Sequence, residues 1–189
     1  TSGTSNFIAG VNAGNSIASG GNYNTVVGDE AGTAITTGDN NTLIGYVAGD
    51  AISTSSANTA VGSFAMTSMT DGADNVAVGT SALDVDTKGS HSVAVGRNAL
   101  GAQNFTTATD SNNTAVGYQA GLSVTTGLRN TLIGAAAGDV LTDADDNVAV
   151  GAGSLGSDTL GSKTVAIGKD ALGVQNFTTA TDTYNTAVG

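Results

Sequence analysis

The sequence predicts an all-β chain that folds as a parallel β-solenoid, or β-roll, of about ten 17-residue coils with two 21-residue coils. Asn-Thr-Ala-Val-Gly and close variants recur, and seven of the ten spacings between their glycines are 17 residues. Glycine and β-branched residues recur at fixed places, which disfavours helix, and the remainder of each unit is Thr, Ser, Asp, Asn and Gly, which favour turns. The anchor glycines are Gly10, Gly28, Gly45, Gly62, Gly79, Gly96, Gly117, Gly134, Gly151, Gly168 and Gly189.

The residues that lead to each anchor glycine alternate as a β-strand does. The residue before the anchor is Val or Ile in ten of eleven units, and Thr or Val mostly stands two places earlier. A column rich in alanine, as at Ala60 and Ala77, lies between them. Since successive side chains of a strand point to opposite faces, we expect the Val and Ile ladder inside the coil and a nearly bare alanine ladder outside.

Two further columns define the rest of the unit. Asparagine stands four places before the anchor in nine units, and Ser92 and Thr164 replace it in the others. We expect these asparagines to stack along a corner and to hydrogen-bond one another and the turn backbone. A small residue, as at Ala31 and Ala48, recurs three places after the anchor. It predicts a second short inward-facing strand across a bend at the glycine.

The two 21-residue units carry a four-residue bulge within residues 103–112 and 175–184, which share the string Gln-Asn-Phe-Thr-Thr-Ala-Thr-Asp. An aromatic side chain among hydroxyls and amides suits glycan contact, and the alternative is a Phe that caps its own coil or a neighbouring subunit. Tyr46 and Tyr118 are weaker candidates of the same kind. The candidate ligand-binding residues are Gln103, Phe105, Thr106, Thr107, Gln175, Phe177, Thr178 and Thr179.

Charge and motifs argue against several classes of function. The net charge is −11 and the five Lys and Arg residues are scattered, which disfavours nucleic-acid binding. No apolar run is long enough to insert into a membrane. The sequence lacks a nucleophile motif, a phosphate loop and zinc-ligand spacing, and we expect the only histidine, His91, at an exposed coil corner. We therefore expect no enzymatic activity.

Calcium is the one metal that the sequence suggests. Asp143, Asp145 and Asp146 lie in one turn, and Asp71 and Asp74 lie in another. Carboxylate oxygens suit Ca²⁺. The alternative is that these side chains only solvate the turns, and no cofactor is predicted beyond this.

The repeat resembles those of a known family. Asn-Thr-Ala-Val-Gly-x-x-Ala-Gly, as in residues 113–121, and its variant in residues 75–83 resemble the repeats of trimeric autotransporter adhesin heads and of related phage tail-fibre proteins. The resemblance covers nearly the whole chain and implies a left-handed β-roll in a homotrimer, outside a cell or on a virion. The exposed alanine ladder expected above points separately to a parallel homo-oligomer.

The function that we expect is that of a structural and adhesive fibre segment. Residues 1–189 would be a single repeat domain from a longer fibre that spaces or presents a surface for a glycan or protein receptor. The alternative is a ligand-binding solenoid such as an ice-binding protein, which the abundant threonine suggests. The Thr-x-Thr string of such a face occurs only at residues 107–109 and 179–181.

Overall fold

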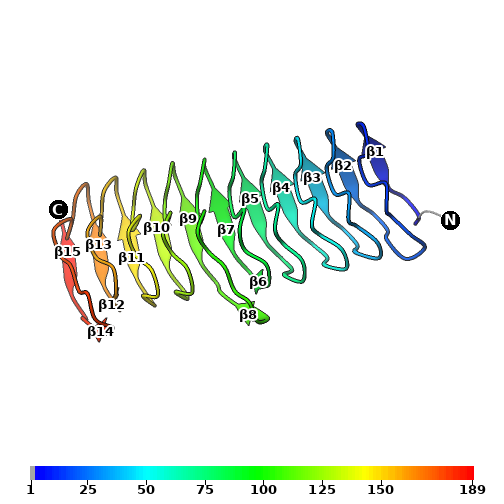
Figure 1. Ribbon diagram of the computed structural model, residues 1–189. Coiled ribbons are helices and arrows are strands. Elements are labelled where there is room, and N and C mark those ends of the chain that lie inside the picture. Colours follow the sequence, from blue (N-terminus) through cyan, green and yellow to red (C-terminus); the bar gives the residue numbers. More distant parts are fainter. Residues whose placement is uncertain (1–2) are drawn as a thin grey trace.

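The computed structural model describes residues 3–189 and shows an elongated stack of coils, with no helix in this part of the chain (Figure 1). One three-residue strand per coil joins an eleven-stranded parallel sheet whose order follows the chain. The parallel β-solenoid is therefore confirmed. Residues 1 and 2 of the predicted domain lie outside the described part. The strands are β1 (Phe7–Ala9), β2 (Thr25–Val27), β3 (Thr42–Ile44), β4 (Thr59–Val61), β5 (Val76–Val78), β7 (Val93–Val95), β9 (Thr114–Val116), β10 (Thr131–Ile133), β11 (Val148–Val150), β13 (Val165–Ile167) and β15 (Thr186–Val188).

The second strand expected after each anchor glycine is absent throughout residues 3–189. Short additional strands occur at another place, shortly before the asparagine column, where β6 (Gly89–Ser90) pairs with β8 (Thr109–Asp110) and β12 (Gly161–Ser162) pairs with β14 (Thr181–Asp182). After the anchor glycine the chain bends. The second and fourth residues after the anchor are left-handed in the coil of β4, with φ of 59° at Phe64 and 58° at Met66. This conformation cannot continue a strand.

The strand faces are reversed relative to the sequence-based expectation. The middle residues Leu43, Ala60 and Ala77 are fully buried, whereas Ile44 is 37% exposed and Val61 is half-buried. The alanine ladder therefore lies inside, and the β-branched ladder lies on the outer face of the sheet. A 17-residue coil encloses a narrow interior, so a continuous inward ladder of Val and Ile would overfill it.

Residue sizes at two positions of most coils complement one another in filling the interior. The positions are the middle of the strand and the fourth residue after the anchor glycine. The coils of β3 and β10 place Leu43 and Leu132 in the strand and glycine four residues after the anchor. A Cβ on Gly49 would lie 2.7 Å from Leu43 Cδ2, and one on Gly138 would lie 2.8 Å from Leu132 Cδ2. Four of the coils with alanine in the strand instead carry a buried large side chain at that later position, whereas the coil of β9 combines Ala115 with Gly121. The four large residues are Met66, Leu83, Leu100 and Leu155.

The asparagine ladder is confirmed. The Asn41 amide N–H donates to Asn24 Oδ1 at 2.9 Å, and Asn41 Nδ2 donates to the Ser55 carbonyl at 3.0 Å. The amide contact to the preceding asparagine side chain recurs at Asn24, Asn58, Asn75, Asn130 and Asn147. The Nδ2 groups of Asn41, Asn75 and Asn130 also donate to the side-chain oxygen of the preceding asparagine. Because these amides are buried, the ladder satisfies backbone groups that water does not reach.

The anchor column requires glycine because the backbones of successive coils approach closely there. Gly45 has φ of 138°, and a Cβ at this position would lie 2.5 Å from the Gly62 carbonyl oxygen. Both the torsion and the contact exclude a side chain.

Candidate interaction surfaces

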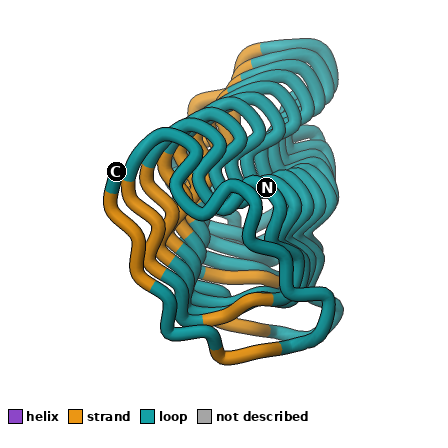
Figure 2. The backbone as a smooth tube through the Cα atoms, turned by 90° about the vertical axis from the view of Figure 1, so that its left-hand side faces the viewer, coloured by secondary structure: helices purple, strands orange, loops and turns teal. Residues whose placement is uncertain are grey.

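The outer face of the eleven-stranded sheet is a continuous strip of uncharged side chains. It is formed by the first and third residues of each strand, and Figure 2 shows the strands aligned along one side of the rod. Ile44, Ile133 and Ile167 are 37%, 39% and 40% exposed. No residue of this outer strip is charged within the described chain, although the net charge is −11.

The strip alternates in composition along the rod. Its first position is Thr in β2, β3 and β4, Val in β5 and β7, Thr in β9 and β10, and Val again in β11 and β13. The third position is Val or Ile from β2 onward. An uncharged, half-exposed strip of this regularity is the kind of surface that another molecule covers.

Exposed aromatic side chains lie beside the strip, just after the anchor glycines. The rings of Tyr46 and Phe64 meet edge to face with centroids 5.4 Å apart, and both are more than two-fifths exposed. The Arg97 guanidinium lies 6.0 Å from the Tyr118 ring centroid. These aromatics widen the apolar surface at that corner.

The first long coil places two of its four predicted ligand-binding residues in the interior. Gln103 is fully buried, and Phe105 is 5% exposed. A Cβ on Gly89 would lie 2.9 Å from Phe105 Cδ2, so the ring occupies space that glycine leaves free in the preceding coil. These two side chains anchor the bulge to the solenoid and are not accessible to a ligand in this structure.

The exposed part of the predicted ligand site is threonine. Thr106, Thr107, Thr178 and Thr179 are exposed, whereas Gln175 and Phe177 are half-buried in the last described long coil. The structure does not bring the two sets together. They form two protrusions, next to β8 and β14, that extend from the same side of the rod (Figure 1). Ligand contact stays a prediction, and in the first copy it concerns the threonines.

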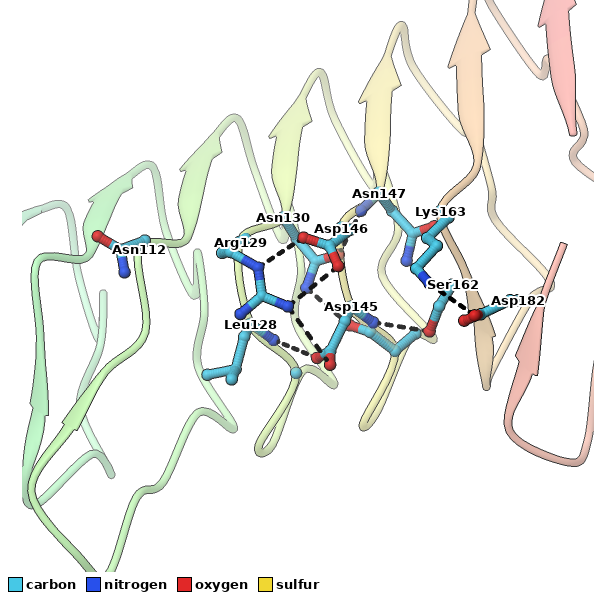
Figure 3. A network of polar contacts seen from close by, with 12 residues as sticks. Asn112, Leu128, Arg129, Asn130, Asp145, Asp146, Asn147, Ser162, Lys163 and Asp182 are labelled. Carbon is cyan, nitrogen blue, oxygen red and sulfur yellow. Dashed lines mark hydrogen bonds and ion pairs between the residues drawn. The ribbon is translucent and has the colours of Figure 1, made fainter. Parts of the chain in front are cut away.

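A ladder of opposite charges lines another corner, drawn in Figure 3. Arg129 Nε donates to Asp146 Oδ1 at 2.6 Å, and Lys163 Nζ lies 2.6 Å from Asp182 Oδ2. The hydrogen bond from Arg129 lowers the pKa of Asp146, and Asp182 raises the pKa of Lys163. Each cation lies one coil from its acid, so the pairs join neighbouring coils.

The aspartates suggested for calcium bind protein groups instead. Asp143 Oδ1 accepts hydrogen bonds from the Thr125 and Thr126 hydroxyls, which lower its pKa. Asp145 Oδ1 accepts from the Leu128 amide at 2.7 Å. Residues 3–189 contain no group of three or more His, Asp or Glu side chains arranged to hold a metal ion.

Two acidic side chains of the other turn lie beside Lys88 and His91. Lys88 Nζ lies 3.1 Å from Asp71, and the exposed His91 ring lies between Asp74 at 3.8 Å and Asp110 at 3.2 Å. His91 therefore lies at a coil corner, as expected, and links three successive coils.

The sequence did not reveal an open hollow of about 670 Å³ near the C-terminal end. Partial burial raises the pKa of one of its lining residues, Asp139. Three of its lining residues are Gly153, Gly156 and Gly173, which have no side chain to extend into the hollow. Its lining residues are Ala136, Asp139, Gly153, Gly156, Asp170, Leu172, Gly173 and Val174.

Comparisons with family models, with curated proteins and with solved structures find no match to this chain. The described residues also include no helix long and apolar enough to cross a membrane.

Proposed function

We propose that this chain is a structural and adhesive fibre segment: a homotrimeric β-roll rod that spaces or presents a receptor-binding surface outside a cell or on a virion. The observation that carries the proposal is the uncharged strip along the whole outer face of the sheet, since a monomer with net charge −11 would leave it uncovered. The resemblance of the repeat to adhesin-head and tail-fibre repeats supports the same assignment, including the left-handed winding.

The strip alone is smaller than one stable interface between two chains, so an assembly must also cover neighbouring surface. Ten strand spacings of about 4.8 Å and a width of three residues give a face of roughly 480 Å². A stable interface buries about 800 Å² per partner. In a ring of three, each chain contacts two neighbours, so the strip and the adjoining corner with Tyr46 and Tyr118 are both covered.

The strip, and not the alanine ladder, would therefore be the subunit contact. Alanine is buried inside each coil, as at Ala77 and Ala94, and is unavailable to a partner chain. The threonine protrusions of the two long coils lie off the main sheet and would stay accessible in such an assembly. They are the part of the rod that we assign to a glycan or protein receptor.

Sedimentation equilibrium at micromolar concentration tests the assembly. We expect a trimer for the unmodified chain, and monomers with an unchanged circular dichroism spectrum for the double variant Ile44→Asp with Ile133→Asp. Val85→Asp is the matched control, because Val85 is 39% exposed but lies outside the strip. It should remain trimeric. A stable monomer of the unmodified chain would contradict the proposal.

A second candidate function is ice binding, which one observation favours. The outer strip is an array in which Thr or Val recurs at a fixed separation along ten of the eleven paired strands. This function requires the strip to be exposed, whereas the trimer covers it. A thermal hysteresis assay separates the two functions. Hysteresis in the unmodified chain that disappears in Thr42→Lys with Thr131→Lys would support ice binding, and no hysteresis in the unmodified chain would exclude it.

A further inference from the structure

One buried column of the solenoid changes from apolar to polar at four places. The seventh residue after each anchor glycine is apolar in six coils and buried in all of them. In the other four coils it is Asp86, Gln103, Asp158 and Gln175, and each aspartate is followed one coil later by a glutamine. The six apolar members are Ile17, Ile35, Ile52, Met69, Val124 and Leu141.

Asp86 is a fully buried carboxylate that depends on the next coil. Its Oδ1 accepts from the backbone amides of Gly89 and Phe105, both at 3.0 Å. Its Oδ2 accepts from Gln103 Nε2 at 2.6 Å. Two of these three donors belong to the long coil of β7, and the Phe105 amide is presented by its bulge. No cation pairs with Asp86 within residues 3–189.

Gln103 also bridges the interruption of the asparagine ladder. Ser92 stands in the asparagine column of that coil, and Gln103 Nε2 donates to its Oγ at 2.8 Å. Gln103 Oε1 accepts from Asn113 Nδ2 at 2.9 Å, where the ladder resumes. Ser92 and Ser111 hydroxyls are hydrogen-bonded to each other. The Asp86 carboxylate and both ends of the Gln103 amide therefore have hydrogen-bond partners. This set of partners occurs where a 17-residue coil is followed by a 21-residue coil.

The second copy repeats the arrangement. Asp158 accepts from the amides of Gly161 and Phe177 at 3.1 and 2.9 Å and from Gln175 Nε2 at 2.6 Å. Gln175 Oε1 accepts from Asn185 Nδ2 at 2.7 Å. The same four kinds of contact therefore mark both long coils, although the neighbouring surface residues differ.

The strands themselves specify their neighbours poorly. Thr-Ala-Val is the sequence of β4, β9 and β15, and Val-Ala-Val is that of β5, β7 and β11. A chain that looped out one coil would form equivalent strand pairs and would still match apolar columns. Only at the Asp–Gln pairs would such a slip leave a buried carboxylate without its donors, which is strongly unfavourable.

We propose that Asp86–Gln103 and Asp158–Gln175 are register-specifying pairs, which fix the coil that stacks on each long coil and so fix the position of each protrusion along the rod. The inference rests on the fold and its contacts and does not depend on the proposed function. A buried polar group that specifies register at the expense of alternatives has a physical precedent in coiled coils.

Engineered disulfides report the register, because the chain has no cysteine. Thr80, Arg97 and Tyr118 are exposed and lie on successive coils, where the Asn98 amide bonds the Thr80 carbonyl and the Gln119 amide bonds the Arg97 carbonyl. Thr80→Cys with Arg97→Cys marks the native neighbour. Thr80→Cys with Tyr118→Cys marks a slip of one coil, because in the native stack these positions are two strand spacings, about 9.6 Å, apart and too distant for a disulfide.

Each cysteine pair is introduced into the double variant Asp86→Leu with Gln103→Leu, and the protein is refolded under oxidising conditions. Non-reducing gel electrophoresis then separates intrachain disulfides from interchain products. We expect the slipped link to increase at least about tenfold, the ratio that loss of one buried hydrogen bond gives. Leu83→Met with Leu100→Met is the control in the same two coils and should leave the slipped link at its original level.

An unchanged yield of slipped link in the Leu variant would overturn the proposal. If that variant does not fold, Asp86→Asn provides the same test, because it keeps the size of the side chain but presents an amide to Gln103 Nε2. We then expect a severalfold increase of the slipped link, and no increase would again contradict the assignment.

Discussion

The coil of β3 and the coil of β5 fill the same outline with different side chains. The first uses Leu43, Gly49 and Ile52, and the second uses Ala77, Leu83 and Asp86 at the corresponding positions. All these residues are buried. The large side chain stands either in the middle of the strand or at the fourth residue after the anchor, and the residue at the other place is small. What differs is the last position, where an isoleucine accepts any apolar neighbour and an aspartate accepts only a coil with matching donors. Packing is thus generic along the rod, and specificity is local.

The largest expected effect concerns what the two coil types share, the anchor glycine. Gly45→Ala and Gly79→Ala should each lower the free energy of unfolding by at least about 4 kcal/mol, because a methyl group meets the next backbone in a left-handed conformation. A Cβ would lie 2.5 Å from Gly62 O in the first case and 2.7 Å from Gly96 O in the second. Urea unfolding measures both. A loss below 1 kcal/mol at either glycine would show that the coils can separate there.

The next largest effect should distinguish the coils. Gln103→Leu removes one donor from the buried Asp86 carboxylate and should lower the free energy of unfolding by about 3 kcal/mol. Leu141→Met, in the same column of an apolar coil, should cost less than about 1.5 kcal/mol. Parallel urea titrations compare them. Equal losses would mean that the polar column is no more demanding than the apolar one.

Converting one coil type into the other tests the exchange of volume directly. Leu43→Ala should cost about 2–4 kcal/mol through the cavity that it leaves. Adding Gly49→Leu should restore much of that loss, since Leu83 and Leu100 occupy the same position with φ of 52° and 48°. Thermal unfolding of the single and double variants gives the answer, and a double variant less stable than Leu43→Ala would contradict the interpretation.

The smallest effect concerns the exposed charge ladder, which borders coils of both types. The hydrogen bond from Arg129 lowers the pKa of Asp146, so the folded state binds this proton less readily than the unfolded state does. The stabilisation is therefore present above the unfolded pKa of 3.8 and is lost as the pH falls through the lower folded value. Both side chains are more than a third exposed, which limits the pair to about 0.5 kcal/mol.

Asp146→Asn should consequently cost about 0.5 kcal/mol at pH 7 and nothing near pH 2. Urea unfolding at the two pH values is the measurement. A loss that is the same at both would assign the effect to something other than the ion pair.

The sequence predicted the solenoid, its period and its asparagine ladder because these follow from spacing alone. It did not predict which strand face is buried, because alternation defines two faces without stating which is inside. The narrow interior decides this, and the pairing of Leu43 with Gly49 is visible only once the coil is closed. A Phe105 that caps its coil was one of the two alternatives for the bulge, but its partner and the role of Gln103 were missed for a related reason: the partner of each lies in the preceding coil, at Gly89 and Asp86.

The absence of charge from the outer strip bears on how thick such a fibre becomes. If the strip is covered within a ring of three, the exposed acids stay on the outside and the surface charge per rod triples. Like-charged rods repel one another laterally, so growth by bundling is opposed while the three-chain rod is retained. Because the outer strip carries none of the 16 acids and 5 cations, the placement of charge would then limit the diameter of the filament to three chains.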